Sequence, residues 1–168
     1  MARKLGLNAT QRLALLKNQA TALLWYGKIE TTEARAKEVA SYVAKIITLA
    51  VNTYDDVITE EVTVKDEKGK EIKKTLVKDG LKKLNARRKI ITLVNDIQEV
   101  KGFKESKADF KKRTAGIKSP LIEKIFDEYA KKYADRKEEN GQGGGYTRIY
   151  KLGQRKGDAA EVAIIELI

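Results

Sequence analysis

Cations, aromatic rings and glycines lie close together in the last part of the chain, from Gly143 to Ala160. Arginine and lysine pair with phosphates, tyrosine rings stack on bases or ribose, and glycines let backbone amides approach a ligand closely. The combination favours a surface that grips a polyanion, although a β-hairpin with solvated charges fits these residues about as well. The phosphate contacts predicted here are Arg148, Lys151, Arg155 and Lys156, and the sugar or base contacts are Tyr146 and Thr147.

Three further groups of cations could join that surface. Arg3 and Lys4 form a basic arm of the kind that stays mobile until it lies along a nucleic-acid backbone. Arg12 flanks the apolar stripe of the first predicted helix. Arg87 and Arg88 lie next to Lys89 within a later helix, where successive side chains point about 100° apart, so the three cannot share one face and at least one or two must face outward. We predict phosphate contacts for all of these, with a solvated surface as the alternative for each group taken alone.

The composition supports a polyanion partner and excludes several kinds of chemistry. Against 35 Lys and Arg stand 24 Asp and Glu, which gives a formal charge of +11. A chain this basic attracts nucleic acid or an anionic membrane before any specific contact forms. Cys and His are absent, which excludes disulfides, thiolate metal sites and Ser-His or Cys nucleophiles. We therefore predict no enzyme, no metal and no cofactor.

The elements that must position these residues alternate between helices and short strands. The expected fold class is α/β of the α+β type: a single compact domain over residues 1–168, with helices packed on a small mixed β-sheet and an inserted β-hairpin. A 168-residue chain can bury roughly 70% of the surface it exposes when unfolded. The expected helices run from Asn8, an N-cap, to Gly27; from Thr31 or Thr32 to about Asn52; from about Asp79 to Glu99; and onward from Ser119-Pro120.

Hydrophobic periodicity predicts which faces of these helices are buried. The first helix has the stripe Leu13, Leu16, Ala20, Leu23 and Leu24, and the third has Leu81, Leu84, Ile91 and Val94. Residues 135–145 are expected to be a polar, glycine-rich loop. Lys28–Thr31 is expected to be a connecting strand, and residues 162–168 a central strand paired with residues 146–152.

Two segments differ from the rest in composition. Residues 53–79 hold six Lys against eight Asp and Glu and are predicted to form an acidic β-hairpin, with its turn at Asp66–Lys70. Residues 101–118 are rich in Lys and are expected to be a loop or an irregular helix. We expect the Lys-rich stretch to contact a polyanion and the acidic hairpin to face solvent or a basic neighbour.

Several motifs occur in the order found in one family. They are Lys4-Leu5-Gly6, Arg12, Ile29 to Glu38, Ile47 to Ala50, Ala86-Arg87-Arg88, Phe126 to Ala130, Tyr133 to Arg136, and Gly144 to Ala160. The chain resembles bacterial large-ribosomal-subunit protein seventeen over nearly its whole length. Leu7 departs from the family pattern, because many members carry arginine there, and residues 53–79 and 101–118 look like insertions.

The resemblance implies a structural constituent of the large ribosomal subunit. It would bind and stabilise large-subunit ribosomal RNA near the rim of the peptide exit tunnel, beside other ribosomal proteins, in the cytoplasm. No small-molecule substrate and no membrane span are expected. Three other classes stay open from the residues alone: a free DNA or RNA regulator, a peripheral membrane protein, and an enzyme that acts on RNA through carboxylates.

Overall fold

The first helix, α1 (Ala9–Tyr26), begins and ends where its sequence predicts. The Asn8 side chain accepts a hydrogen bond from the backbone N–H of Gln11 at 2.8 Å, which satisfies one of the unpaired donors of the first turn. Gly27 ends the helix in the left-handed conformation, with φ at 81°. Leu16, Ala20 and Leu23 are buried as predicted, but Leu13 is exposed. The computed structural model describes residues 3–65 and 71–168, without the side chains of 61–65 and 71–74.

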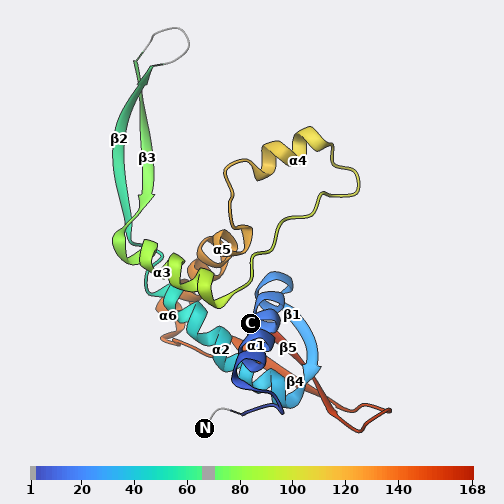
Figure 1. The fold of residues 1–168 in the computed structure, drawn as a ribbon. Coiled ribbons are helices and arrows are strands. Elements are labelled where there is room, and N and C mark those ends of the chain that lie inside the picture. Colours follow the sequence, from blue (N-terminus) through green and yellow to red (C-terminus); the bar gives the residue numbers. More distant parts are fainter. Residues whose placement is uncertain (1–2, 66–70) are drawn as a thin grey trace.

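The second helix, α2 (Glu33–Val51), runs through the middle of the molecule (Figure 1). It packs against α1, the C-terminal helices and the sheet described below. Its buried side chains recur at helical spacing. They are Ala36, Val39, Val43, Ile46, Ile47, Ala50 and Val51.

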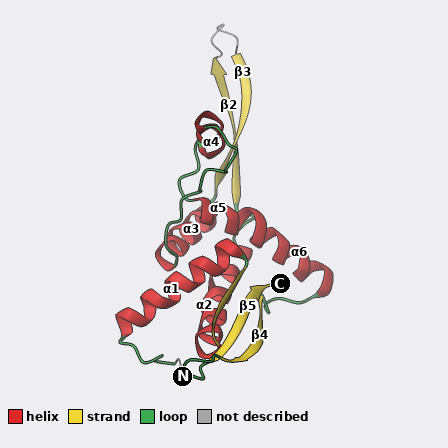
Figure 2. Cartoon of the chain, turned by 90° about the vertical axis from the view of Figure 1, so that its right-hand side faces the viewer, coloured by secondary structure: helices red, strands yellow, loops and turns green. Residues whose placement is uncertain are grey.

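The main sheet has the strand order β1-β5-β4, with β5 in the centre. The strands are β1 (Lys28–Thr32), β4 (Thr147–Gln154) and β5 (Glu161–Leu167). Ile165 pairs with Ile29 on one side and Ile149 on the other, and this face packs on α2. Figure 2 shows α1 and α2 on one side of this sheet. The predicted pairing of β4 with a central β5 is confirmed, and all pairings among the described strands are antiparallel, so the expected mixed sheet is wrong.

A long C-terminal helix replaces part of the predicted loop at 135–145. It is made of α5 (Pro120–Lys124), a wider π-helical turn η1 (Ile125–Ala130) and α6 (Lys131–Asn140). Tyr133 and Ala134 are buried and hold the start of α6 on the core, so the polar residues that follow continue the helix. The helix ends at Gly141, whose φ is 64°.

The third helix, α3 (Leu81–Leu93), is shorter than predicted. Val94 is extended, and the backbone N–H of the next residue, Asn95, donates to the Thr21 hydroxyl at 2.9 Å, which takes the chain away from the helical path. Leu81 is 76% exposed and Ile91 is also exposed, whereas Ile90 and Val94 are buried. Of the predicted buried residues, Val94 is confirmed and Leu84 is half-buried, whereas Leu81 and Ile91 are wrong, because the buried stripe runs through Ala86, Ile90 and Val94.

Two excursions leave this body on the side of α3 and α5 (Figure 1). The first is the predicted hairpin, formed by β2 (Val57–Lys65) and β3 (Glu71–Asp79), and its turn at 66–70 lies outside the described residues. The second follows α3 and contains the short helix α4 (Lys107–Thr114) within otherwise irregular chain, as expected for the Lys-rich stretch.

Candidate nucleic-acid interface

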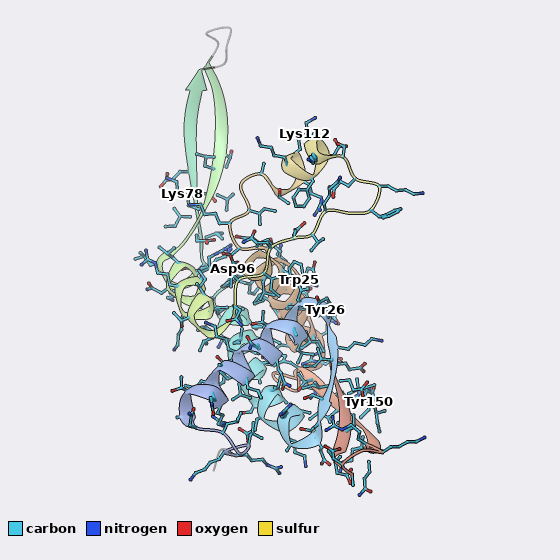
Figure 3. All side chains as sticks on the ribbon, turned by 45° about the vertical axis from the view of Figure 1, so that its right-hand side comes forward. Trp25, Tyr26, Lys78, Asp96, Lys112 and Tyr150 are labelled. Carbon is cyan, nitrogen blue, oxygen red and sulfur yellow. The ribbon has the colours of Figure 1, made fainter. Side chains whose placement is uncertain are left out.

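The β4–β5 hairpin carries the predicted tail cations into solvent. Arg148, Tyr150 and Lys151 of β4 are exposed, and so are Arg155 and Lys156 of the connecting turn. We call these five residues the hairpin surface. Figure 3 labels Tyr150, on the hairpin at the end of the molecule away from α4. Strand alternation gives Arg148 and Tyr150 the sheet face opposite to Ile149, which packs on the core.

Arg148 is hydrogen-bonded to Tyr150, and Tyr150 is hydrogen-bonded to a carboxylate. The Tyr150 hydroxyl donates to Glu166 Oε1 at 2.9 Å and accepts from Arg148 Nη1 at 3.4 Å. The bond to Tyr150 is the main cause that raises the pKa of Arg148. One nitrogen is engaged here, and the rest of the guanidinium fork stays open to a phosphate.

The turn between the strands is closed by an ion pair. Arg155 Nε lies 2.8 Å from Asp158 Oδ1, and its Nη2 lies 2.5 Å from Oδ2. Arg155 and, second, the Ala160 N–H lower the pKa of Asp158 to about 2. Arg155 therefore shapes the turn as well as facing solvent. Lys156, next to it, forms no ion pair with the side chains that the structure describes.

Glu33 ties the hairpin to the start of α2. Its Oε1 lies 3.1 Å from Lys151 Nζ and 2.6 Å from Lys37 Nζ. The bonds from Lys37 and then Lys151 lower the pKa of Glu33, so the carboxylate stays ionised at neutral pH. One acid therefore holds two lysines side by side, on different elements.

Glu38 ties the amino-terminal arm to the same helix. Its Oε1 accepts from the Arg3 backbone N–H at 3.2 Å, and its Oε2 accepts from Arg12 Nη2 at 2.6 Å. The bond from Arg3 is the main cause that lowers the pKa of Glu38. Arg12 also donates from Nε to the Arg3 carbonyl at 2.6 Å. Arg12 thus holds the arm in place. Its guanidinium is half-buried and bound to Glu38, which argues against the predicted phosphate contact of Arg12.

The arm borders a surface hollow of about 500 Å³ at the beginning of α1. Arg3, Lys4 and Arg12 line it together with Asn8, the N-cap of that helix. The first backbone N–H groups of a helix, with its dipole, favour an anion at this position. The cations and the N-terminus of the helix therefore both attract an anion.

Three segments therefore bring their cations to one end of the molecule, which we call the basic end. Arg35 and Lys37 of α2, both exposed, belong to it and were missed by the sequence analysis. Their spacing on α2 carried no signal, because only the pairing of β1 with β5 and the ion pairs of Glu33 and Glu38 bring them beside the hairpin and the arm. The basic end consists of Arg3, Lys4, Arg35, Lys37, Arg148, Lys151, Arg155 and Lys156.

Tyr146 does not lie on this surface. It precedes β4, after Gly144 and Gly145, whose φ values of 97° and 61° set the chain off the strand path. The ring is 6% exposed and packs edge-on to Tyr133, with centroids 4.8 Å apart. The predicted base or sugar contact by this ring is corrected: Tyr146 is a core residue in this structure. Thr147, which follows it, is half-buried beside Leu167.

Arg87 and Arg88 lie apart from the basic end, on α3 (Figure 1). Arg87 pairs with Glu123 through two bonds of 2.7 and 2.8 Å and with Asp79 at 2.5 Å, and it stacks on the Phe126 ring. The Glu123 bond is the main cause that raises its pKa. Arg87 therefore joins α3, α5 and the base of the acidic hairpin, which argues against its predicted phosphate contact. Arg88 is exposed.

The described part of the chain has neither a candidate metal site nor a membrane-spanning helix. Within residues 3–65 and 71–168, no group of three or more acidic side chains is arranged to hold a metal ion. In the same part of the chain, no helix is long and apolar enough to cross a membrane.

Comparison with known proteins gives one family. The family model described as "Ribosomal protein L17" matches residues 15–168. The chain is 42% identical to a "Large ribosomal subunit protein bL17" from Lachnospira eligens over 185 aligned residues, which cover 99% of this chain and 98% of that relative. Proteins with the same description from Acetivibrio thermocellus and Clostridium botulinum are 41% and 36% identical, each over 99% of this chain and over 98% and 96% of the relative.

Proposed function

Because the chain belongs to the ribosomal protein L17 family, a family of large-subunit structural proteins, we propose that it binds and stabilises large-subunit ribosomal RNA through its basic end. Members are ribosome components, and bacterial ribosomes are cytoplasmic. We propose no catalysis for it. By the same family resemblance, its position is near the rim of the peptide exit tunnel, beside neighbouring ribosomal proteins, and residues 1–168 form a single domain.

The observation that carries the RNA proposal is the pair of anchors on α2. Glu33 holds Lys151 of the hairpin, and Glu38 holds the backbone of Arg3 in the arm. With both segments fixed to the start of one helix, cations far apart in sequence gather in one basic surface at the same end of the molecule. Such a surface neutralises several phosphates at once, and release of their counterions supplies affinity.

Specificity comes from the shape of the RNA. The major groove of an A-form helix is too deep and narrow for side chains to read, so contacts go to phosphates and 2′-hydroxyls. At two points of the hairpin, Arg148 offers an open guanidinium fork, and Lys156 offers an ammonium that no described acidic side chain pairs with. Arg88, on α3, would contact RNA only as a separate site.

The test is the double variant Arg148→Glu with Lys156→Glu, which leaves the ion pairs of Lys151 and Arg155 intact. We expect a large drop in its incorporation into large subunits, measured by sedimentation of assembled particles. The matched control reverses Lys132 and Lys137 on α6, where Asp135, Glu138 and Glu139 already balance the lysines. Normal incorporation of the double variant, with the fold intact, would remove the hairpin from the interface.

A further inference from the structure

Residues 101–118, which we call the basic lobe, form a second element that the fold itself does not need. Between Val94 and Pro120, all of it described, no side chain is buried. In Figure 1 the lobe extends from the body on the side of α3 and α5, away from the three-stranded sheet. Ordering a segment costs conformational entropy, and this one recovers none of that cost through burial in the core.

The lobe is held together by its own acids. Arg113 pairs with Glu99 and with Glu105, whose Oε1 lies 3.0 Å from Arg113 Nε. Glu105 Oε2 also accepts from the Gly102 N–H at 3.0 Å. Ser106 and Asp109 cap the start of α4, where the Asp109 N–H donates to the Ser106 hydroxyl at 3.1 Å. Both acids of the lobe are thereby used inside it.

The lobe carries a large excess of positive charge. The lobe holds seven Lys and Arg against two acids, and Arg113 is occupied by Glu99 and Glu105. All six lysines of the lobe are exposed, and Figure 3 labels Lys112 among them. They are Lys101, Lys104, Lys107, Lys111, Lys112 and Lys118.

Phe103 is the unusual side chain in this setting. It is fully exposed, at 102%, between Lys101 and Lys104. The second phenylalanine of the lobe, Phe110, is half-buried beneath the Arg113 guanidinium, 5.5 Å from its ring centre. Of its two aromatic rings, the lobe therefore covers Phe110 and leaves Phe103 exposed to solvent.

We propose that the basic lobe is a second RNA-binding element, in which Phe103 stacks on an unpaired base and the flanking lysines bind phosphates. Aromatic rings within a positive surface are the usual platform for single-stranded bases, because every base has a π-face. The inference rests on the proposed function, since both elements would contact the same RNA, but it concerns a different surface from the basic end.

The surface chemistry favours RNA over other partners. A membrane-binding helix needs several bulky apolar residues along one face, and α4 has only Phe110, which is covered by Arg113. The core of a protein–protein interface is depleted of charge, whereas here the exposed ring has a lysine at each side.

Photo-crosslinking in assembled large subunits tests the contact, with p-benzoylphenylalanine placed singly at positions 103, 150 and 77. We expect position 103 to crosslink to RNA, position 150 to do so on the hairpin surface, and position 77, exposed on the acidic hairpin, not to do so. RNA crosslinks from 150 but not from 103 would overturn the lobe inference and leave the proposed function standing. RNA crosslinks from neither would count against both.

Two further outcomes of this experiment would overturn the inference. A crosslink from 103 to a ribosomal protein would make the lobe a protein-binding element. Equal RNA crosslinks from 103 and 77 would mean that the probe reports only closeness to bulk RNA.

Affinity measurements separate stacking from general attraction. For the full-length protein with large-subunit ribosomal RNA of the same organism, we expect Phe103→Ala to weaken binding by roughly 5- to 150-fold. Phe103→Trp should restore it and Phe103→Leu should not. Val100→Ala is the control, because that side chain is exposed but has no ring. Equal binding by the Leu and Trp variants would contradict stacking.

Discussion

The carboxyl group of Asp56 lies directly against the backbone of Gly80: a Cβ atom added at Gly80 would come within 2.4 Å of Asp56 Cγ. Asp56 Oδ2 accepts from the backbone N–H groups of Lys82 at 2.8 Å and Lys83 at 3.2 Å. Asp56, which precedes the hairpin, therefore caps α3, which follows the hairpin. Gly80 has no side chain and so leaves room for this cap. The two ends of the acidic hairpin are joined through this contact.

A double-mutant cycle on these two residues measures the cap. We expect Asp56→Ala to lower the free energy of unfolding by about 1 kcal/mol, as for the loss of a helix cap. Gly80→Ala should cost about 1–3 kcal/mol, because its Cβ collides with the carboxyl group. In the Asp56→Ala background the same Gly80→Ala change should cost little, since a φ of −68° suits alanine. Additive effects in urea denaturation would contradict the contact.

Arg87 and Arg88 are adjacent but should behave differently. Arg87→Ala removes the partner of Glu123 and one of the two partners of Asp79, which keeps Lys83, so we expect a loss of about 1–3 kcal/mol in unfolding free energy, reduced from the buried-pair value by partial exposure. Arg88→Ala should change stability by less than about 0.5 kcal/mol. Denaturant titration of the two variants decides this, and equal stability losses would refute the assigned role of Arg87.

The sequence predicted the fold best where one local signal decides. Asn8 and Gly27 mark the ends of α1, and the apolar run in β5 places that strand in the centre of the sheet. It failed where tertiary packing decides. Leu81 fits a helical stripe but faces solvent, because the α3 side chains buried in the core are Ala86 and Ile90, on another face of the helix. The polar residues after Tyr133 read as a loop, although the buried ring continues the helix.

The sequence predicted only part of the candidate site, again because tertiary packing decides the rest. Composition and the tail motif indicated a polyanion surface, and the hairpin cations are indeed exposed. Charge alone could not reveal which cations are used inside the fold. Arg12 and Arg87 carry the same charge as Arg148, and only the positions of Glu38, Asp79 and Glu123 distinguish them.

Burial of Tyr133 should make stability fall at high pH. Desolvation raises the pKa of this phenol from 10 to about 12, so the neutral form is favoured in the fold. The resulting stability is fully present below pH 10 and is lost as the pH rises to about 12, by at most about 2–3 kcal/mol. We expect Tyr133→Phe to flatten that decline in denaturation measured from pH 9 to 12.

Part of the alkaline decline should remain in Tyr133→Phe, because burial also raises the pKa of Tyr42 and Tyr129. Tyr26→Phe, at an exposed ring, is the matched control and should leave the decline unchanged. An identical pH profile for wild type and Tyr133→Phe would contradict this account.

Substitutions at Tyr146 and Tyr150, four residues apart, should separate effects on stability from effects on RNA binding. Tyr146→Ala removes a buried ring that packs on Tyr133, and we expect a loss of about 3–5 kcal/mol in unfolding free energy, as for other buried aromatic residues. Tyr146→Phe removes only a hydroxyl that lies 3.3 Å from Thr48 Oγ1 and should leave RNA affinity unchanged.

Tyr150, 43% exposed on the hairpin surface, should show the reverse pattern. Tyr150→Ala should alter stability by less than about 1 kcal/mol, while binding to large-subunit RNA weakens, because Arg148 loses the hydroxyl that positions it. Thermal unfolding and filter binding on the same preparations measure both effects. A Tyr146→Phe protein that is folded but binds RNA poorly would return that ring to the interface.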